Sequence, residues 1–329
     1  MYILEHILLS LGGVTLFLLG LKFISENMEE LSSKKVKNLI YNFTKNKYVG
    51  VLTGAGVTAL VQSSIATNVI VVGFVSSGIM TFYSASAVIM GANIGTTITA
   101  HLVSLSQSSL FNVTAIGSLV GFIGFLLSFS KNKNVSLLGN VLTGFCMIFI
   151  GLDVINNGVI FFKNYAFFRS IFLVESDVLL LLNGIVITAL VQSSSAVSSV
   201  IIILASNGLV DFSSAIFLIL GANIGTCLPV ILASLNKSEE AQKTAFFNLC
   251  FNVLGVLLLF IPLTLFKGQI SLIFKLFSSG IEKQIANFHT LFNLIVTAVI
   301  LPFLSGFTLI LDKLFLKFKQ TPKNSLKRA

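Results

Sequence analysis

The sequence predicts an all-α polytopic membrane protein built from two inverted-topology repeats, each with a re-entrant helical hairpin and a broken membrane-spanning helix. The first observation is composition: 55% of the 329 residues are hydrophobic and 10% are charged, whereas about 25% of the residues of a soluble domain are charged. The second is that the chain spells TALVQSS and GANIGT twice. Polar or glycine interruptions at matching places in two apolar halves are typical of inverted repeats that surround a central site.

The duplication has a fixed spacing. The first copies of the two motifs occupy residues 58–64 and 91–96, and the second copies occupy residues 188–194 and 221–226. Both motifs therefore recur at the same offset of 130 residues. Two motifs that recur together in this way indicate an internal duplication of a structural unit.

The distribution of charged residues and cysteines argues against a cleavable leader and against a nucleic-acid-binding protein. No Asp, Glu, Lys or Arg occurs between Lys47 and Lys131, and the apolar character extends along the chain, which excludes a cleavable leader as its source. The net charge is +9, but the lysines lie between apolar segments and near the C-terminus, where they flank a membrane instead of binding nucleic acid. Cys146, Cys227 and Cys250 lie singly among apolar neighbours, which indicates packing residues.

We expect the first repeat to occupy residues 1–130. Residues 3–24 are long enough to span, because about 20 apolar residues cross a ~30 Å hydrocarbon core. Residues 25–47 alternate Glu and Lys with apolar residues at helical spacing, which predicts an interfacial helix on the membrane surface. Residues 48–77 are interrupted by Gln-Ser-Ser, leaving arms too short to span, which predicts a re-entrant hairpin. A broken span over 81–105 and a span over 110–129 complete the repeat.

The second repeat is expected over residues 131–266 and follows the same order. Its predicted elements are a span over 136–162, a hairpin over 178–206, a broken span over 212–235 and a span over 241–266. Residues 267–311 are predicted to add a lysine-containing loop and a final span over 285–311. Residues 312–329 are predicted to form a basic cytoplasmic tail.

This layout makes seven crossings, with three in each repeat and a final one. An odd number of crossings in a repeat places the next repeat in the opposite orientation. The predicted loops divide the basic residues unevenly, with 16 of the 21 Lys and Arg residues on one side. The positive-inside rule makes that side cytoplasmic. We therefore expect the N-terminus outside, the C-terminus inside and the hairpins entering from opposite faces of a cytoplasmic (inner) membrane.

The hairpin tips carry the candidate chemistry. Bare helix ends at mid-membrane depth need a ligand or a cavity, because each leaves about four backbone groups unpaired. A serine at the tip can cap the second arm, whose positive end favours an anion, while carbonyl oxygens suit a small hard cation. The candidate residues are Gln62, Ser63 and Ser64 in the first tip and Gln192, Ser193, Ser194 and Ser195 in the second.

The GANIGT motifs have two interpretations. In one, Gly91 and Gly95 permit unusual backbone dihedrals, and polar side chains line a central site; these are Asn93, Thr96 and Thr97, with Asn223 and Thr226 in the second copy. In the other, GxxxG is the small-residue pattern by which membrane helices pack closely. No Lys or Arg occurs in either motif, so a bound anion would depend on amides, hydroxyls and co-bound cations. That need predicts ion coupling.

Three further residues lie inside predicted spans. Asp153 is a candidate ion ligand, because a carboxylate within a membrane span often serves function. His101 lies at the end of a span and is better interpreted as interfacial than as a proton relay. His289 belongs to FHTLFN, which echoes FNLCFN at residues 247–252. That echo fits either a packing motif or polar groups that line the site.

With these motifs in place, the chain resembles the sodium-dependent phosphate cotransporter family, type II, in its bacterial branch. Two QSS motifs, each followed by GANIGT, carry the resemblance, together with GGVTLFLLGLKFISENMEEL near the start. The resemblance implies sodium-coupled symport of inorganic phosphate by alternating access, with sodium and phosphate held at the tips. It implies no enzymatic activity, no cofactor and no transition metal, with Na⁺ as the coupling ion and the bilayer as partner.

The chain departs from the family pattern at Ile65, where the family has a third serine, so one coordination contact and the sodium stoichiometry are in question. Thr67 and Asn68 are candidates to compensate. The C-terminal regulatory domain of many bacterial relatives is expected to be absent. Transport of another small oxyanion, phosphate export, a membrane scaffold or sensor, and an intramembrane serine hydrolase are the alternatives. The last lacks a G-x-S-x-G motif. Whether the protein forms a homodimer stays open.

Overall fold

The computed structural model describes residues 2–43, 46–107, 113–162 and 176–325, and helices are the regular secondary structure throughout these ranges. Six of the helical segments are long and apolar enough to cross a membrane: Ile3–Leu31, Phe82–Ser106, Lys133–Phe161, Phe212–Ser234, Glu239–Leu265 and Ile281–Phe315. These correspond to six of the seven predicted crossings. The seventh corresponds to α6 (Val113–Ser128), of which 16 helical residues are described. The chain is therefore an all-α, multi-pass membrane protein.

Both predicted hairpins are present as pairs of short helices. The first consists of α2 (Lys47–Val61) and α3 (Ser64–Ser76), and the second of α9 (Asp177–Val191) and α10 (Ser194–Ser206). Each is followed by a helix pair with a one-residue interruption. These pairs are α4 (Phe82–Thr96) with α5 (Ile98–Ser106), and α11 (Phe212–Gly225) with α12 (Cys227–Ser234).

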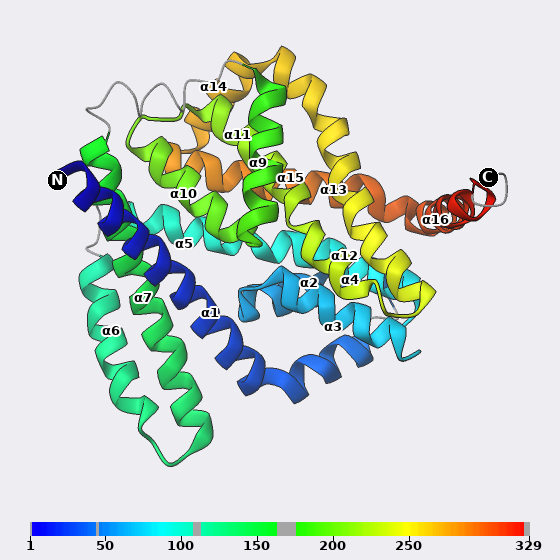
Figure 1. Cartoon of the computed structure of the whole chain (residues 1–329), viewed down its shortest axis with the longest axis horizontal. Helices are drawn as coiled ribbons and strands as arrows, with labels where there is room; N and C mark the ends of the chain where they lie inside the picture. The colour runs from blue at the N-terminus through cyan, green and yellow to red at the C-terminus, as the bar shows by residue number, and fades with distance from the viewer. Residues whose placement is uncertain (1, 44–45, 108–112, 163–175, 326–329) are drawn as a thin grey trace.

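The helix predicted at 25–47 is not separate from the first span, because α1 runs without interruption over Tyr2–Phe43. Residues 25–43 contain neither proline nor glycine, so nothing in this stretch removes a hydrogen bond of the helix ladder. Figure 1 shows the long α1 ribbon changing direction along its length while remaining helical. The amphipathic stretch therefore continues the helix of the first span, and its place on the membrane surface stays a prediction.

The C-terminal prediction also needs correction. The final span is divided into α15 (Ile281–Ile300) and α16 (Leu304–Ser325) by a 3₁₀ turn at Leu301–Phe303. Pro302 lies in that turn and lacks the N–H that would continue the ladder. Residues 312–325, predicted as a tail, belong to α16, which extends away from the body at the right of Figure 1.

The remaining helices are α7 (Lys133–Phe162), α13 (Glu239–Leu265) and α14 (Lys267–Phe277). Helices α1, α6 and α7 pack together, and Figure 1 shows α6 and α7 as an antiparallel pair beside α1. The inner arms of the hairpins pack across the molecule: α3 contacts α12 and α13, whereas α10 contacts α5 and α15. Each hairpin therefore packs against the broken helix of the other repeat.

Glycines set the distance between α1 and α7. A methyl group built on Gly13, Gly20, Gly144 or Gly151 would lie within 3.0 Å of atoms of the facing helix. Gly20 faces the carbonyl oxygen of Gly144, and Gly144 faces that of Gly20. Gly151 in turn faces the carbonyl oxygen of Gly13. Gly13 and Gly20 have the same seven-residue spacing as Gly144 and Gly151, so the two repeats meet in the reciprocal pattern of a two-fold contact.

The GANIGT glycines have the same role, so the prediction of unusual dihedrals there is wrong. Gly91 and Gly95 lie inside regular α4, and a methyl group on either would collide with the backbone of α2 at Val51 or Ala55. In the second copy, Gly221 and Gly225 meet the backbone of α9 in the same way. The glycines serve close packing between the broken helix and the outer hairpin arm, which is the GxxxG interpretation.

Charged residues tie the outer ends of the hairpins to the rest of the molecule. Lys47 Nζ donates to the carbonyl oxygens of Leu301 and Pro302 at 3.0 and 3.2 Å, which the turn between α15 and α16 leaves available. At the equivalent position of the second hairpin, Asp177 pairs with Lys267 at 2.5 Å. The first residue of each hairpin therefore contacts another helix or turn through its charged side chain.

The close contact at Gly91 predicts a selective effect of Gly91→Ala. The added methyl group would force α4 away from α2, and overpacking of this kind costs about 1–3 kcal/mol. Gly56→Ala is the matched control, because Gly56 on α2 has no atom within 4 Å of its added methyl group. We expect thermal unfolding in detergent to show a lower Tm for Gly91→Ala and an unchanged Tm for Gly56→Ala. Equal Tm values would contradict the packing role.

Candidate functional site at the hairpin tips

The two hairpin tips meet at one small pocket of about 50 Å³. We call residues 62–65 the first tip and residues 192–195 the second tip. All eight tip residues line the pocket together with Thr226. The duplicated Gln-Ser-Ser motifs, which are far apart in sequence, therefore face a common space.

Each tip turns through a glutamine in the left-handed region. Gln62 has φ 57° and ψ 22°, and Gln192 has φ 58° and ψ 27°. Their backbone N–H groups donate to Thr58 O and Thr188 O at 2.8 and 2.7 Å, which ends the outer arm. This conformation is uncommon for a residue with a side chain. It allows the chain to reverse between two helices within two residues.

A serine then caps the inner arm of each hairpin. Ser63 Oγ accepts from Ala66 N at 3.1 Å, and Ser193 Oγ accepts from Ala196 N at 3.2 Å. Ser64 and Ser194 are the first residues of α3 and α10, and both are buried. The N-termini of both inner arms therefore meet the pocket, where their first amides and positive dipole ends favour an anion.

The pocket lining contains polar but uncharged side chains. No Lys, Arg, His, Asp or Glu of the described residues lines it. The described part of the chain also contains no group of three His, Cys, Asp or Glu residues that could hold a metal ion. The oxygen atoms that this pocket offers are hydroxyls, carboxamides and backbone carbonyls, the ligand types of a small hard cation.

The GANIGT asparagines lie in buried clusters behind the pocket. Asn93 Nδ2 donates to Asn248 Oδ1 at 3.2 Å, and Asn252 Nδ2 donates to Asn93 Oδ1 at 3.3 Å. In the second repeat, Asn223 Oδ1 lies 3.1 Å from His289 Nε2. The side chains of all five residues are at most 5% exposed. These contacts join each broken helix to α13 or α15 and do not reach the pocket lining.

The remaining predicted residues are buried near the tips but outside the lining. Thr67 Oγ1 accepts from Thr58 Oγ1 at 3.0 Å, and Thr97 Oγ1 accepts from Thr290 Oγ1 at 3.0 Å. Thr96 Oγ1 donates to Ala92 O at 3.0 Å. Asn68 is buried and its Oδ1 has no hydrogen-bond partner among the described residues.

Two predicted candidates lie elsewhere. Asp153 is exposed on α7, and its carboxylate accepts from Asn157 Nδ2 at 3.4 Å. His101 lies on α5, where its Nε2 is 2.8 Å from Thr290 Oγ1. Neither residue lines the pocket. The Asp153 carboxylate therefore does not serve as an ion ligand in the pocket in this structure.

Sequence reasoning missed or left open several residues of this region. For Asn248, Asn252 and Asn293, the FNLCFN and FHTLFN echo left open a packing role and a site-lining role, and the Phe and Asn positions of both motifs are buried. Thr99 was missed. Its Oγ1 donates to Gln62 Oε1 at 3.0 Å, and only the tertiary structure reveals that contact.

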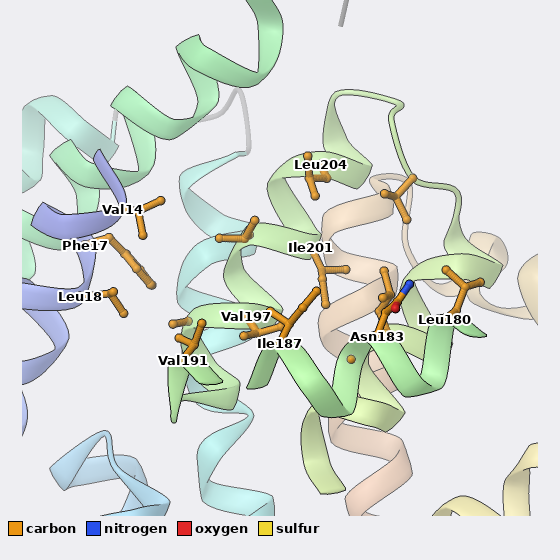
Figure 2. Close-up of a pocket in the computed structure, with 15 residues that line it drawn as sticks. Val14, Phe17, Leu18, Leu180, Asn183, Ile187, Val191, Val197, Ile201 and Leu204 are labelled. Carbon is orange, nitrogen blue, oxygen red and sulfur yellow. The ribbon is translucent and has the colours of Figure 1, made fainter. Parts of the chain in front are cut away.

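A larger cavity of about 380 Å³ lies between α1 and the second hairpin. Figure 2 shows its lining, in which Val14, Phe17 and Leu18 face Leu180, Ile187 and Val191. Among the residues that the structure describes, Asn183 is the one polar side chain that lines it. A cavity so poor in hydrogen-bond donors would leave a phosphate unpaired, so its size does not make it the anion site.

The asparagine cluster predicts a stability effect of Asn252→Ala. The substitution removes the donor to Asn93 and leaves the buried Oδ1 of Asn93 without that hydrogen bond, which lowers the free energy of unfolding by about 1–3 kcal/mol. Asn157→Ala is the control, because Asn157 is exposed on α7. We expect thermal unfolding in detergent to separate the two variants, with a lower Tm for Asn252→Ala alone. A wild-type Tm for Asn252→Ala would show that the cluster is dispensable.

Sequence comparisons give relatives over most of the chain. It is 29% identical over 304 residues to YqeW of Bacillus subtilis, an uncharacterized protein, covering 90% of this chain and 94% of YqeW. It is 26% identical over 299 residues to the putative inorganic phosphate export protein YjbB of Escherichia coli, covering 89% of this chain and 53% of YjbB. The chain therefore spans about half the length of YjbB.

A shorter region resembles an animal protein. The chain is 38% identical over 104 residues to the human sodium-dependent phosphate transport protein 2B, covering 31% of this chain and 15% of that protein. No solved structure matches this chain. The Na⁺/Pi-cotransporter family profile matches residues 16–157 and 171–284. This coverage, with the duplicated tips that meet at one pocket, shows that the chain belongs to the Na⁺/Pi-cotransporter family.

Proposed function

We propose that this protein carries inorganic phosphate across the membrane by coupling its movement to sodium ions. The observation that carries the proposal is the meeting of two equivalent, uncharged, serine-rich tips at one pocket. The N-termini of α3 and α10 supply positive dipole ends and unpaired amides for the phosphate oxygens. The family and the names of two relatives, which refer to phosphate, support this choice of anion.

The absence of a cationic side chain from the pocket supports sodium coupling. A phosphate anion held by amides and hydroxyls alone keeps its negative charge in a medium of low dielectric constant, which is costly. A co-bound Na⁺ would offset that charge. Carboxamide and hydroxyl oxygens of Gln192, Ser194 and Thr226 border the pocket, and oxygen ligands are those that a small hard cation prefers.

The repeat architecture supports alternating access. We propose that the two repeats have opposite orientations in the membrane, so that one hairpin opens to each face. The reciprocal glycine contacts between α1 and α7, Gly20 with Gly144 and Gly13 with Gly151, support this symmetry. The excess of basic residues on one side of the predicted topology favours a cytoplasmic membrane with the N-terminus outside and the C-terminus inside.

Direction follows from the ion gradients, so import and export use the same pocket. An inward sodium gradient favours import, and the membrane potential contributes about 2.3 kcal/mol per net charge per 100 mV. One relative is named as a putative phosphate exporter, which keeps export as the second candidate. The serine hydrolase alternative loses support, because neither His101 nor His289 lines the pocket with the tip serines.

The coupling is tested by uptake of radiolabelled phosphate into proteoliposomes that contain the purified protein. We expect an inward sodium gradient to drive accumulation and an equal potassium gradient to give none, because K⁺ is too large for the same oxygen cage. Protein-free liposomes are the control for leak. Phosphate uptake that proceeds equally with either cation would reject sodium coupling while retaining transport.

The site is tested by Ser194→Ala and Gln192→Ala. Each substitution removes a polar group that borders the pocket, and a hydrogen bond to a charged ligand contributes about 1.5–3 kcal/mol, which corresponds to a roughly 10- to 100-fold loss in the uptake kcat/KM. Ser206→Ala, at the other end of α10, is the matched control and should transport normally. Wild-type uptake by both tip variants would remove the tips from the site.

A further inference from the structure

The two tips have the same sequence motif but different hydrogen bonding. In the first tip, Gln62 Oε1 accepts from Thr99 Oγ1 at 3.0 Å, and Gln62 Nε2 donates to Ala59 O. The oxygen and the nitrogen of the Gln62 carboxamide are therefore both hydrogen-bonded to the protein. We call the Thr99–Gln62 hydrogen bond the brace. Thr99 belongs to α5, so this contact also links the first tip to the broken helix of its own repeat.

The second tip lacks this brace. Gln192 is exposed, and its carboxamide makes no hydrogen bond to any residue that the structure describes. The residue equivalent to Thr99, at the repeat offset of 130, is Pro229. A proline offers neither a hydroxyl nor an N–H, so it cannot hold the Gln192 carboxamide as Thr99 holds that of Gln62.

The arms of the hairpins differ in the same direction. In the first hairpin, Thr58 Oγ1 donates to Thr67 Oγ1 at 3.0 Å and ties α2 to α3 next to the tip. In the second hairpin, Val197 replaces Thr67. The hydroxyl of Thr188, equivalent to Thr58, is fully buried without a partner among the described residues.

The space behind the tips is also unequal. Val191, Ala196 and Val197, which flank the second tip, line the apolar cavity of about 380 Å³ between this hairpin and α1. Figure 2 shows Val191 and Val197 at that cavity, facing the α1 residues Val14, Phe17 and Leu18 across it. In the first hairpin, α2 packs directly against α1. A tip beside this cavity has fewer packed side chains to displace when it shifts.

We propose that Thr99 is a positioning residue that fixes the carboxamide of Gln62 before ligand binds, so that the first tip is pre-organised and the second tip is the one that rearranges around the ligand. This inference rests on the proposed function for its ligand, but the difference between the tips exists without one. A side chain that is already held loses less conformational entropy on binding, so the brace lowers the cost of occupying the pocket. The second tip meets that cost during binding.

The first test measures the resting difference between the tips by hydrogen–deuterium exchange of the full chain in detergent, without phosphate or sodium. The Gln62 and Gln192 amides make equivalent backbone bonds, so a difference in exchange reports the other contacts of each tip, and the Thr99 variants then isolate the contribution of Thr99. We expect peptides over the first tip to exchange at least about threefold more slowly than those over the second, the effect of one net hydrogen bond. Equal rates in the wild-type protein would overturn the proposal.

Substitution of Thr99 then identifies the cause. Thr99→Val keeps the volume and removes the donor, and it should raise exchange at the first tip toward that of the second, while the Thr58–Thr67 hydrogen bond remains. Thr99→Ser keeps the donor and should preserve slow exchange. Ser104→Ala is the matched control, because Ser104 is buried on the same helix and donates to His101 O instead of Gln62. Should Thr99→Val not fold, Thr99→Ala, which also lacks the donor, replaces it with the same expectation.

The same variants separate positioning from a structural role in transport. In proteoliposomes we expect Thr99→Val to raise the KM for phosphate or sodium roughly three- to tenfold with a nearly unchanged maximal rate, and Thr99→Ser and Ser104→Ala to retain the wild-type KM. Equal losses in Thr99→Val and Ser104→Ala would overturn the positioning role. If the wild-type protein does not transport phosphate, the proposed function fails, and the exchange experiment still decides the role of Thr99.

Discussion

The structure depends on how it pairs the backbone groups at the helix ends of the two hairpin tips. At each tip an outer helix ends and an inner helix begins within two residues, at Gln62–Ser63 and again at Gln192–Ser193. In hydrocarbon, the amides and carbonyls released there have no water to pair with. Three features reduce this cost. Each tip turns through a glutamine in the left-handed region, a serine caps the inner arm, and the two tips border one polar pocket.

Close helix packing makes that arrangement possible. The glycines of both GANIGT motifs let α4 and α11 touch the backbones of α2 and α9, which fixes each outer arm to the broken helix of its own repeat. Buried amides then connect those broken helices to α13 and α15. Small residues therefore determine how near the helices come, while asparagines determine their register, a division of roles common in membrane interiors.

The duplication produces two similar tips, but the chain does not use them identically. Thr99 and Thr67 brace the first, whereas Pro229 and Val197 occupy the equivalent places around the second. The outer ends differ as well, since Lys47 binds carbonyl oxygens and Asp177 binds Lys267. The duplication places two similar tips at one pocket, and the contacts around the tips differ between the two copies.

Composition and repetition by themselves determined the class, the hairpins, the broken spans and the tip residues, because the cost of polar groups in lipid leaves few arrangements for such a pattern. The same reasoning failed where one sequence pattern is compatible with two different structures. Glycines in GANIGT fit both an irregular backbone and a close contact, and residues 25–47 fit both a separate helix and a continuation of the first helix. Tertiary structure decided these cases. It also revealed the brace by Thr99, the exposed place of Asp153 and the asparagine clusters, because contacts between distant residues depend on how helices pack, which no local pattern encodes.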